Sequence, residues 1–204
     1  MTQRQTLLVT LIKKTLNFYW FIFDMFAYKF KKIGDMYYNK FIGTAYRREY
    51  ADVNISKHQK VLHIGCGVFP LTEMTIVSST GAQVVGIDRN KKVLPAARDI
   101  IQRKQIDGKI QFVYGNGVDY PVDGFDVIII SSCATPILQI LDHVIHDAKD
   151  NAMIIVREVE TAVRPLLRYL NAQNDITIIK KIGHYGFPFP GLLGWQAFYI
   201  IKKE

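Results

Sequence analysis

The sequence has few cysteines and no sign of a membrane-spanning or secretory segment. Two cysteines, Cys66 and Cys133, are too few for a disulfide framework or a cysteine-based metal cluster, which favours a reducing, cytoplasmic setting. Near the N-terminus, the charge-free stretch 15–23 has nine residues, whereas a spanning helix needs about 20 apolar residues. Because no small-residue cleavage site follows this stretch, we do not expect a signal peptide.

Internal repeats and low-complexity tracts are also missing, and 204 residues with 49% hydrophobic and 22% charged residues are typical of one folded domain with an appendage. The net charge of +8 is uneven. Residues 1–60 contain eleven Lys and Arg against four Asp and Glu, a net charge of +7, whereas residues 61–204 carry +1. Thirteen of the 25 aromatic residues lie between Phe18 and Tyr50. We therefore distinguish a basic, aromatic N-terminal segment (1–54) from a nearly neutral body (55–204).

The N-terminal segment predicts a helix with a narrow polar stripe. At helical spacing, this stripe is formed by four residues: Lys13, Asn17, Asp24 and Lys31. Trp20 and Tyr28 flank it, and the opposite face is aromatic, with Tyr19, Phe23, Phe26 and Phe30. Two interpretations stay open: a helix packed on the body or on a second subunit, or a helix at an anionic membrane surface, where basic and aromatic side chains are favoured. We do not expect nucleic acid as a partner, because apolar side chains dilute the basic ones and no known binding module occurs.

The body alternates short β-branched runs with helical patterns. Strands are predicted at 60–65, 83–88, 110–114, 125–131, 152–156, 176–182 and 196–202, and helices at 71–79, 91–105, 136–147 and 164–171. This alternation implies right-handed crossovers and a sheet covered on both faces. The predicted fold is α/β: a Rossmann-like, doubly wound, mostly parallel sheet of seven strands with an N-terminal helical extension.

A glycine turn, Gly65-Cys66-Gly67, follows the first predicted strand, where parallel sheets bind their ligands. Glycines let the backbone approach a ligand closely, and the N-terminus of the following helix attracts negative charge. The third glycine of the dinucleotide fingerprint is replaced by Pro70, which argues against NAD.

The next strand ends also carry ligand-type residues. Asp88 ends the second strand, 21 residues after Gly67, where an acid can accept both hydroxyl protons of a ribose. Asn116 and Gly117 follow the third strand, and an amide there can read the amine of an adenine. Ser132 lies in the small polar turn after the fourth strand. Together, these four strand ends are much more specific than a glycine turn alone.

With these motifs, residues 55–204 resemble the class I S-adenosylmethionine-dependent methyltransferases. The resemblance implies S-adenosyl-L-methionine as cofactor, and from the few cysteines and histidines we expect no metal. The resemblance also implies a place for each motif: the methionine part at Gly65, Cys66 and Gly67, the ribose at Asp88, and adenine at Asn116 and Gly117.

Two positions, His63 and Phe69, depart from the common methyltransferase pattern, which usually has an acid at the first and often a glycine at the second. The stretches 65–72 and 157–161 are more similar to nicotianamine synthases, which transfer the aminocarboxypropyl arm of S-adenosylmethionine. The N-terminal segment is shorter than the helical domain of those enzymes.

We therefore expect an S-adenosylmethionine-dependent methyltransferase whose acceptor is a small molecule, apolar or membrane-borne. Aminocarboxypropyl transfer and a non-catalytic scaffold that keeps the fold are the alternatives. Methyl transfer needs positioning more than a strong nucleophile, so no catalytic residue is identified. For an amine acceptor, Asp119, Glu158 or a tyrosine of the N-terminal segment can act as base.

Several residues have structural interpretations beside the functional ones. Asp88 can cap the helix that follows it, and His63 fits a hydrogen-bonded core histidine better than a proton acceptor. Cys133 fits a small buried residue better than a nucleophile. His143 and His146 fit a solvated helix face better than a metal site.

Near the C-terminus, two further groups have open roles. Arg157 and Glu158 either face the substrate or form a surface ion pair. Tyr185, Phe187 and Phe189 either close over an apolar acceptor or cover the edge of the sheet.

Overall fold

The computed structural model describes residues 3–38, 42–51, 53–106, 108–185 and 194–203. The described helices are α1 (Gln3–Lys29), α2 (Lys31–Tyr37), α3 (Gly43–Ala51), α4 (Leu71–Thr80), α5 (Leu94–Arg103), α6 (Ile137–Asp147), the short 3-10 helix η2 (Glu160–Ala162) and α7 (Val163–Asn171). The strands are β1 (Lys60–Ile64), β2 (Gln83–Asp88), β3 (Ile110–Tyr114), β4 (Val127–Ile130), β5 (Met153–Val159), β6 (Ile176–His184) and β7 (Trp195–Lys202).

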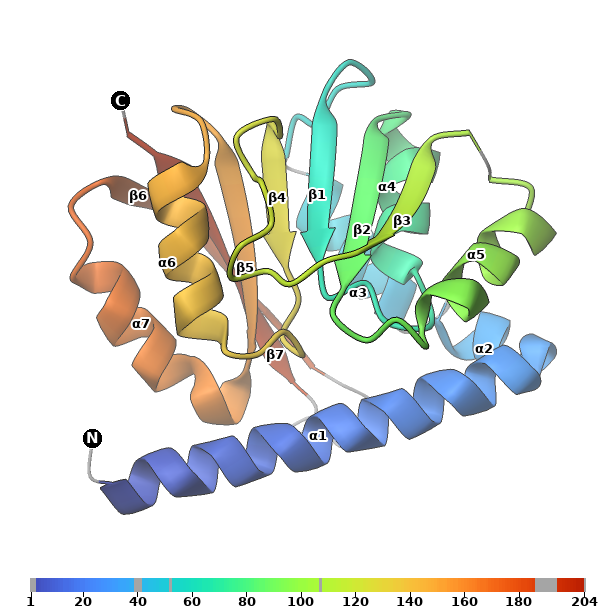
Figure 1. The fold of residues 1–204 in the computed structure, drawn as a ribbon, viewed down its shortest axis with the longest axis horizontal. Helices are drawn as coiled ribbons and strands as arrows, with labels where there is room; N and C mark the ends of the chain where they lie inside the picture. The colour runs from blue at the N-terminus through green and yellow to red at the C-terminus, as the bar shows by residue number, and fades with distance from the viewer. Residues whose placement is uncertain (1–2, 39–41, 52, 107, 186–193, 204) are drawn as a thin grey trace.

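The seven strands form one sheet in the order β3-β2-β1-β4-β5-β7-β6 (Figure 1). Strands β1 to β5 all run parallel to one another, and β7 is antiparallel to both β5 and β6. The order reverses between β1 and β4, which is the place where a doubly wound sheet opens a crevice for its ligand. The predicted α/β fold, with its mostly parallel seven-stranded sheet, is confirmed.

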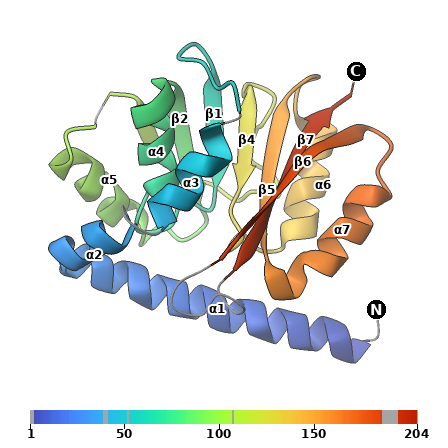
Figure 2. The ribbon, with the colours of Figure 1, turned by 180° about the vertical axis from the view of Figure 1, so that it is seen from behind.

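Helices cover both faces of this sheet. Figures 1 and 2 show α6 and α7 on one face and α3, α4 and α5 on the other. The central strands are apolar on both sides for this reason: all four residues of β4 are buried. Ile128 packs in the cluster with α6 and α7, whereas its neighbour Ile129 packs in the cluster on the opposite face.

Helix α1 lies across the carboxyl ends of the parallel strands and forms one edge of the molecule (Figures 1 and 2). Two polar contacts fix it there. The Asn17 amide donates a hydrogen bond to the carbonyl oxygen of Cys133 after β4, at 2.9 Å. Lys13 Nζ lies 2.7 Å from a carboxylate oxygen of Glu158 on β5, and both side chains are buried. The polar stripe of α1 therefore faces the body.

The stripe is shorter than the sequence indicates. Helix α1 ends at Lys29, and Phe30 has non-helical backbone angles (φ −103°, ψ 71°) before α2 begins. Lys31 therefore lies in α2, where it is exposed and does not continue the stripe of α1. Among the described residues, no helix is long and apolar enough to cross a membrane.

A buried ion pair links α3 to the body. The Arg157 Nε atom donates to Glu49 Oε2 at 2.8 Å, and its guanidinium also donates to the Thr72 hydroxyl at 3.0 Å. Trp195 on β7 donates its indole N–H to the other carboxylate oxygen of Glu49 at 2.9 Å. Burial acts to raise the pKa of Glu49, but the Arg157 charge and hydrogen bonds from His184 and Trp195 outweigh it, so the pKa is lowered overall. Glu49 thus carries its charge at neutral pH and compensates a buried cation.

Candidate active site

The glycine turn after β1 has a backbone that requires glycine. Gly65 (φ +88°) and Gly67 (φ +66°) both lie in the left-handed region. The turn is held by Asp88, whose Oδ2 atom accepts a hydrogen bond from the Gly67 N–H at 3.0 Å. The other oxygen of Asp88 accepts from the Asn90 N–H at 2.8 Å, while α5 begins only at Leu94. Asp88 therefore does not cap the next helix, and that interpretation of it was wrong.

A cavity of about 100 Å³ opens beside this turn, at the ends of β1, β2 and β3. We call it the cofactor cavity. Five of the predicted site residues line it: Gly65, Gly67, Asp88, Asn116 and Gly117. A Cβ atom at position 117 would lie 2.5 Å from Ile64 Cγ2, so this position has room only for a glycine.

The chemistry of the cofactor cavity fits a nucleoside. Asp88 supplies a carboxylate and Asn116 an amide, and the apolar walls come from Ile64, Ile87 and Ile140. A flat base can lie against such apolar walls, while the polar groups take the hydroxyls and the ring edge. The residues present thus suit the adenosine part of S-adenosylmethionine.

A second cavity, of about 120 Å³, lies between the sheet and the N-terminal helices. We call it the acceptor cavity. Cys66 and Ser132 line it, and it shares Gly65, Gly67 and Cys133 with the cofactor cavity. All seven residues predicted to bind the cofactor therefore border one of the two adjoining cavities. Their individual binding roles stay predictions.

The N-terminal segment contributes one wall of the acceptor cavity. Trp20 and Asp24 come from α1, while Tyr38 and Tyr46 come from the region of α2 and α3. A tyrosine of the N-terminal segment was one of the three candidate bases, and both of these tyrosines belong to that segment. These four side chains make the acceptor cavity a joint product of the N-terminal segment and the body.

Asp24 is the acidic residue that sequence reasoning did not single out as a functional group. Its carboxylate accepts hydrogen bonds from the Tyr38 hydroxyl and from the Phe69 backbone N–H. A Cβ atom on Gly67 would lie 3.5 Å from Asp24 Oδ2, so the carboxylate faces the open side of the glycine turn. Burial raises its pKa to about 7, against the lowering effect of the two hydrogen bonds. A carboxyl group with this pKa can release or take up a proton near neutral pH.

Arg157 and His63 lie deeper in the acceptor cavity. Arg157 is buried and paired with Glu49. Of its two interpretations, the surface ion pair was therefore wrong. His63 Nδ1 lies 2.7 Å from Glu73 Oε1, and both side chains are buried. Gly86 leaves room for this pair, because a Cβ there would lie 2.6 Å from Glu73 Oε1. His63 is thus the hydrogen-bonded core histidine that the sequence favoured.

The two cysteines are free thiols with little nucleophilic character. Burial raises the pKa of Cys133 to about 12 and raises that of Cys66 well above its usual range. Because the thiolate is the reactive form, both thiols act here as small cavity-lining groups.

The other candidate bases and ligands lie elsewhere. Asp119 is exposed and does not line either cavity, and Glu158 is engaged with Lys13. The buried Glu158 therefore does not form the surface ion pair considered for it. His143 and His146 both contact Asp147 at the end of α6, and the described residues contain no group of three or more potential metal ligands.

In the loop before β7, Tyr185 is exposed. Phe187 and Phe189 lie outside the described residues, so the two interpretations of this loop remain predictions.

Comparisons with known proteins identify the family of the domain. Residues 55–182 match the methyltransferase domain family. No curated protein matches the sequence. Among solved structures, a mutant of MtNAS, a nicotianamine synthase, is similar over 100% of this chain and 78% of its own, with a TM-score of 0.74 and 17% identity.

The same mutant in complex with S-adenosylmethionine is similar over 96% of this chain and 77% of its own, with a TM-score of 0.73 and 16% identity. The [4+2]-cyclase SpnF covers 79% of this chain and 81% of its own, with a TM-score of 0.64 and 12% identity. At these identities the structural likeness concerns the fold, whereas the family match covers more than half of the chain. The chain belongs to the methyltransferase domain family, and its cofactor is S-adenosylmethionine.

Proposed function

We propose that this protein transfers a methyl group from S-adenosylmethionine to a small molecule bound in the acceptor cavity, with Asp24 as the base. The single observation that carries the proposal is a carboxyl group with a pKa of about 7 that faces the open side of the glycine turn. When bound, the cofactor would supply a carbon that its sulfonium activates: a nucleophile would form a bond to this carbon, and the sulfur would leave with the bonding electrons as a neutral thioether.

The residues of the chain have separate tasks in this reaction. Asp88 holds the glycine turn through the Gly67 N–H and offers its carboxylate to the ribose. Near pH 7, Asp24 is ionised in about half of the protein molecules. In this form it takes the proton of an attacking amine or hydroxyl. Tyr38 and the Phe69 N–H hold the carboxylate in place. Trp20 and Phe69 supply apolar walls, which favour an acceptor with an apolar part.

Aminocarboxypropyl transfer is the second candidate, and one specific observation favours it. The likeness to MtNAS extends over 100% of this chain, including the N-terminal segment, whereas SpnF covers 79%. The helices that form the wall of the acceptor cavity are therefore part of the likeness to a nicotianamine synthase. In this reaction the same nucleophile attacks the γ-carbon of the methionine arm, and methylthioadenosine leaves.

Two labels distinguish these reactions. The purified protein is incubated with a fractionated cell extract and S-adenosylmethionine labelled either on the methyl group or on the carboxyl carbon. Methyl transfer moves only the methyl label to the acceptor and produces S-adenosylhomocysteine. Aminocarboxypropyl transfer moves only the carboxyl label and produces methylthioadenosine. Cofactor binding without transfer of either label would contradict both reactions and favour the non-catalytic scaffold.

The role of Asp24 has its own test on the fraction that accepts the label. For the wild type, kcat/KM should rise with pH and level off above about pH 7, where Asp24 is ionised. Asp24→Asn should lower kcat by about 10²–10⁴ and remove this rise. Asp35→Asn is the matched control, since Asp35 lies on α2 outside the acceptor cavity and pairs with Lys104. An unchanged pH profile in Asp24→Asn would show that Asp24 is not the base.

A further inference from the structure

The N-terminal helices pack some apolar residues on the body but also carry an exposed apolar face on the opposite side. The described residues include thirteen exposed large hydrophobic side chains, and ten of them lie on α1, α2 or the residue between these helices. We define the outer face by nine of these ten: Leu11, Phe18, Phe21, Ile22, Met25, Phe26, Phe30, Ile33 and Met36. Phe18 is 66% exposed and Ile22 51%. A soluble monomer rarely exposes so many apolar side chains side by side, so this surface indicates a binding partner.

The charges around the outer face are of one sign. Exposed lysines accompany the apolar residues at positions 14, 29 and 32, whereas Lys31 lines a pocket against α5. Residues 1–37 contain only two acids, Asp24 and Asp35. Asp24 faces the acceptor cavity, and Asp35 is bound to Lys104 at 2.8 Å. The outer face thus combines apolar side chains with positive charge that no nearby acid on these helices offsets.

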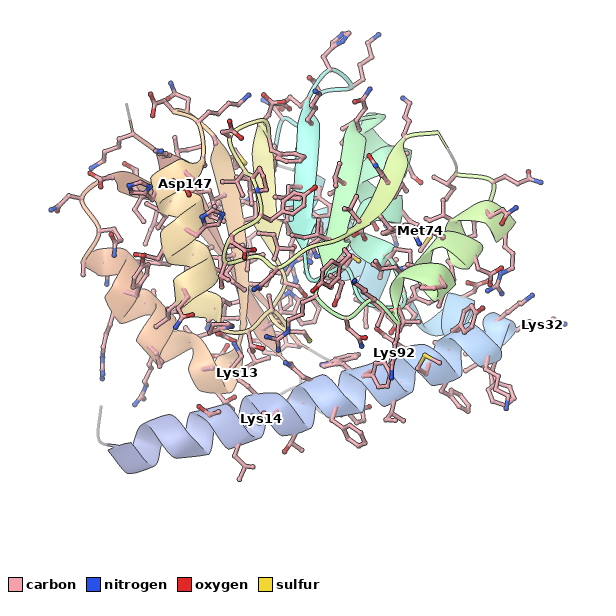
Figure 3. The ribbon with its side chains drawn as sticks, viewed as in Figure 1. Lys13, Lys14, Lys32, Met74, Lys92 and Asp147 are labelled. Atoms are coloured by element: carbon pink, nitrogen blue, oxygen red, sulfur yellow. The ribbon has the colours of Figure 1, made fainter. Side chains whose placement is uncertain are left out.

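The position of α1 allows a flat partner to reach this face. In Figures 1 and 2, α1 runs along one edge of the molecule, and no other labelled element extends beyond it on that side. A helix of 27 residues is about 40 Å long. Figure 3 shows Lys13 directed from α1 toward the body, whereas Lys32 extends outward near the far end of the helical segment. A planar surface can therefore contact the helix along its length without meeting the sheet.

We propose that the outer face of α1 and α2 docks on an anionic lipid bilayer, with α1 lying flat in the headgroup layer. Aromatic and aliphatic side chains of such a helix enter the boundary of the acyl chains, and lysines beside them attract anionic headgroups. A second copy of this chain fits less well. A symmetric pair would bring the two lysine-bearing faces together, and the outer face offers no acids to pair with the lysines.

Docking would give α1 two functions on opposite sides. Its inner side contributes Trp20 and Asp24 to the acceptor cavity, while its outer side contacts lipid. The acceptor cavity would then lie one helix diameter from the bilayer, which suits an apolar acceptor. The docking itself does not depend on the proposed reaction, because it rests on the outer face alone.

Vesicle sedimentation of the full chain tests this proposal. We expect binding to vesicles of phosphatidylcholine and phosphatidylglycerol in equal parts, weaker binding to phosphatidylcholine alone, and loss of the difference near 1 M salt, where the Debye length is about 3 Å. The triple variant Phe18→Ser, Ile22→Ser and Phe26→Ser should lose binding to both vesicles. Each of Lys14→Glu and Lys29→Glu should weaken binding to the anionic vesicles at least about fivefold, since a basic residue near such a surface contributes about 1 kcal/mol.

The matched control is Ile179→Ser, which changes an exposed apolar residue on β6 that is 54% exposed. It should bind like the wild type. A depth measurement adds a second readout: brominated lipid should quench the fluorescence of a tryptophan introduced by Phe18→Trp, but not that of one introduced by Ile179→Trp. Absence of wild-type binding to anionic vesicles would overturn the proposal. A concentration-dependent dimer that the triple variant dissociates, without vesicle binding, would overturn it in favour of a second copy.

Discussion

The cofactor cavity and the acceptor cavity adjoin each other but are built in different ways. The cofactor cavity is formed by turns directly after strands of the body, so its shape depends on local backbone geometry at Gly65, Gly67 and Gly117. The acceptor cavity is formed by side chains that are far apart in the sequence, such as Asp24 and Arg157. Cofactor binding is thus a property of the fold, whereas the proposed acceptor site depends on how the N-terminal helices pack on the body.

Breaking the ion pair between Glu49 and Arg157 should reduce stability most, and it tests whether the N-terminal helices are an essential part of the structure. Glu49→Leu leaves Arg157 buried without its partner, which should lower the free energy of unfolding by about 3–5 kcal/mol. Denaturation by urea measures this change. The double variant Glu49→Leu with Arg157→Met removes both charges and should recover most of the lost stability. A single variant as stable as the wild type would show that the ion pair between Glu49 and Arg157 does not hold the N-terminal helices on the body.

Asp24 in the acceptor cavity should make the stability of the folded protein depend on pH. The pKa of Asp24 is raised from 3.8 to about 7 in the folded protein, so the folded state binds its proton more tightly than the unfolded state. The stability that Asp24 contributes is therefore fully present below about pH 4 and is lost as pH rises to about 7. Relative to the wild type, Asp24→Asn should gain stability over this range, by at most about 4 kcal/mol at about 1.4 kcal/mol per pKa unit.

Thermal melts of both proteins at a series of pH values measure this gain. Asp35→Asn is the control, since Asp35 is a part-exposed acid that pairs with Lys104 outside the acceptor cavity. A difference between Asp24→Asn and the wild type that stays constant from pH 4 to pH 8 would contradict the raised pKa of Asp24.

A substitution in the cofactor cavity should change binding more modestly. Asp88→Ala removes the acceptor of the Gly67 N–H and the carboxylate proposed for the ribose. Hydrogen bonds to a charged group contribute about 1.5–3 kcal/mol, so binding of S-adenosylhomocysteine should weaken about tenfold to hundredfold in calorimetry. Asp123→Ala is the control, since this exposed acid does not line either cavity. Equal affinities of both variants would remove Asp88 from the cofactor site.

The body could be predicted well because its signals are local. The glycine turn and Asp88 are next to the strands that position them, and the strand pattern already implies that parallel strands end at one edge. Even there, the sequence did not reveal that Asp88 holds the Gly67 N–H.

The acceptor side could be predicted only in part. Helical spacing gave the polar stripe of α1, but the direction in which it points depends on contacts with residues far along the chain, such as Cys133 and Glu158. A signal for Asp24 was present: it is the only acid in residues 1–34, and it lies at helical spacing from Lys13 and Asn17. The partner of Arg157 could not be predicted, because Glu49 lies 108 residues away.

The role of Glu49 limits which truncated or chimeric forms of this protein can be stable. In a truncated chain that begins near residue 55, Arg157 would stay buried without the carboxylate of Glu49. The core of such a chain would therefore be destabilised. A chimera with another N-terminal segment would need a carboxylate that reaches the same guanidinium and the Trp195 indole. An exchange of acceptor specificity is therefore more promising through substitutions around Asp24 and Trp20 than through replacement of the whole segment.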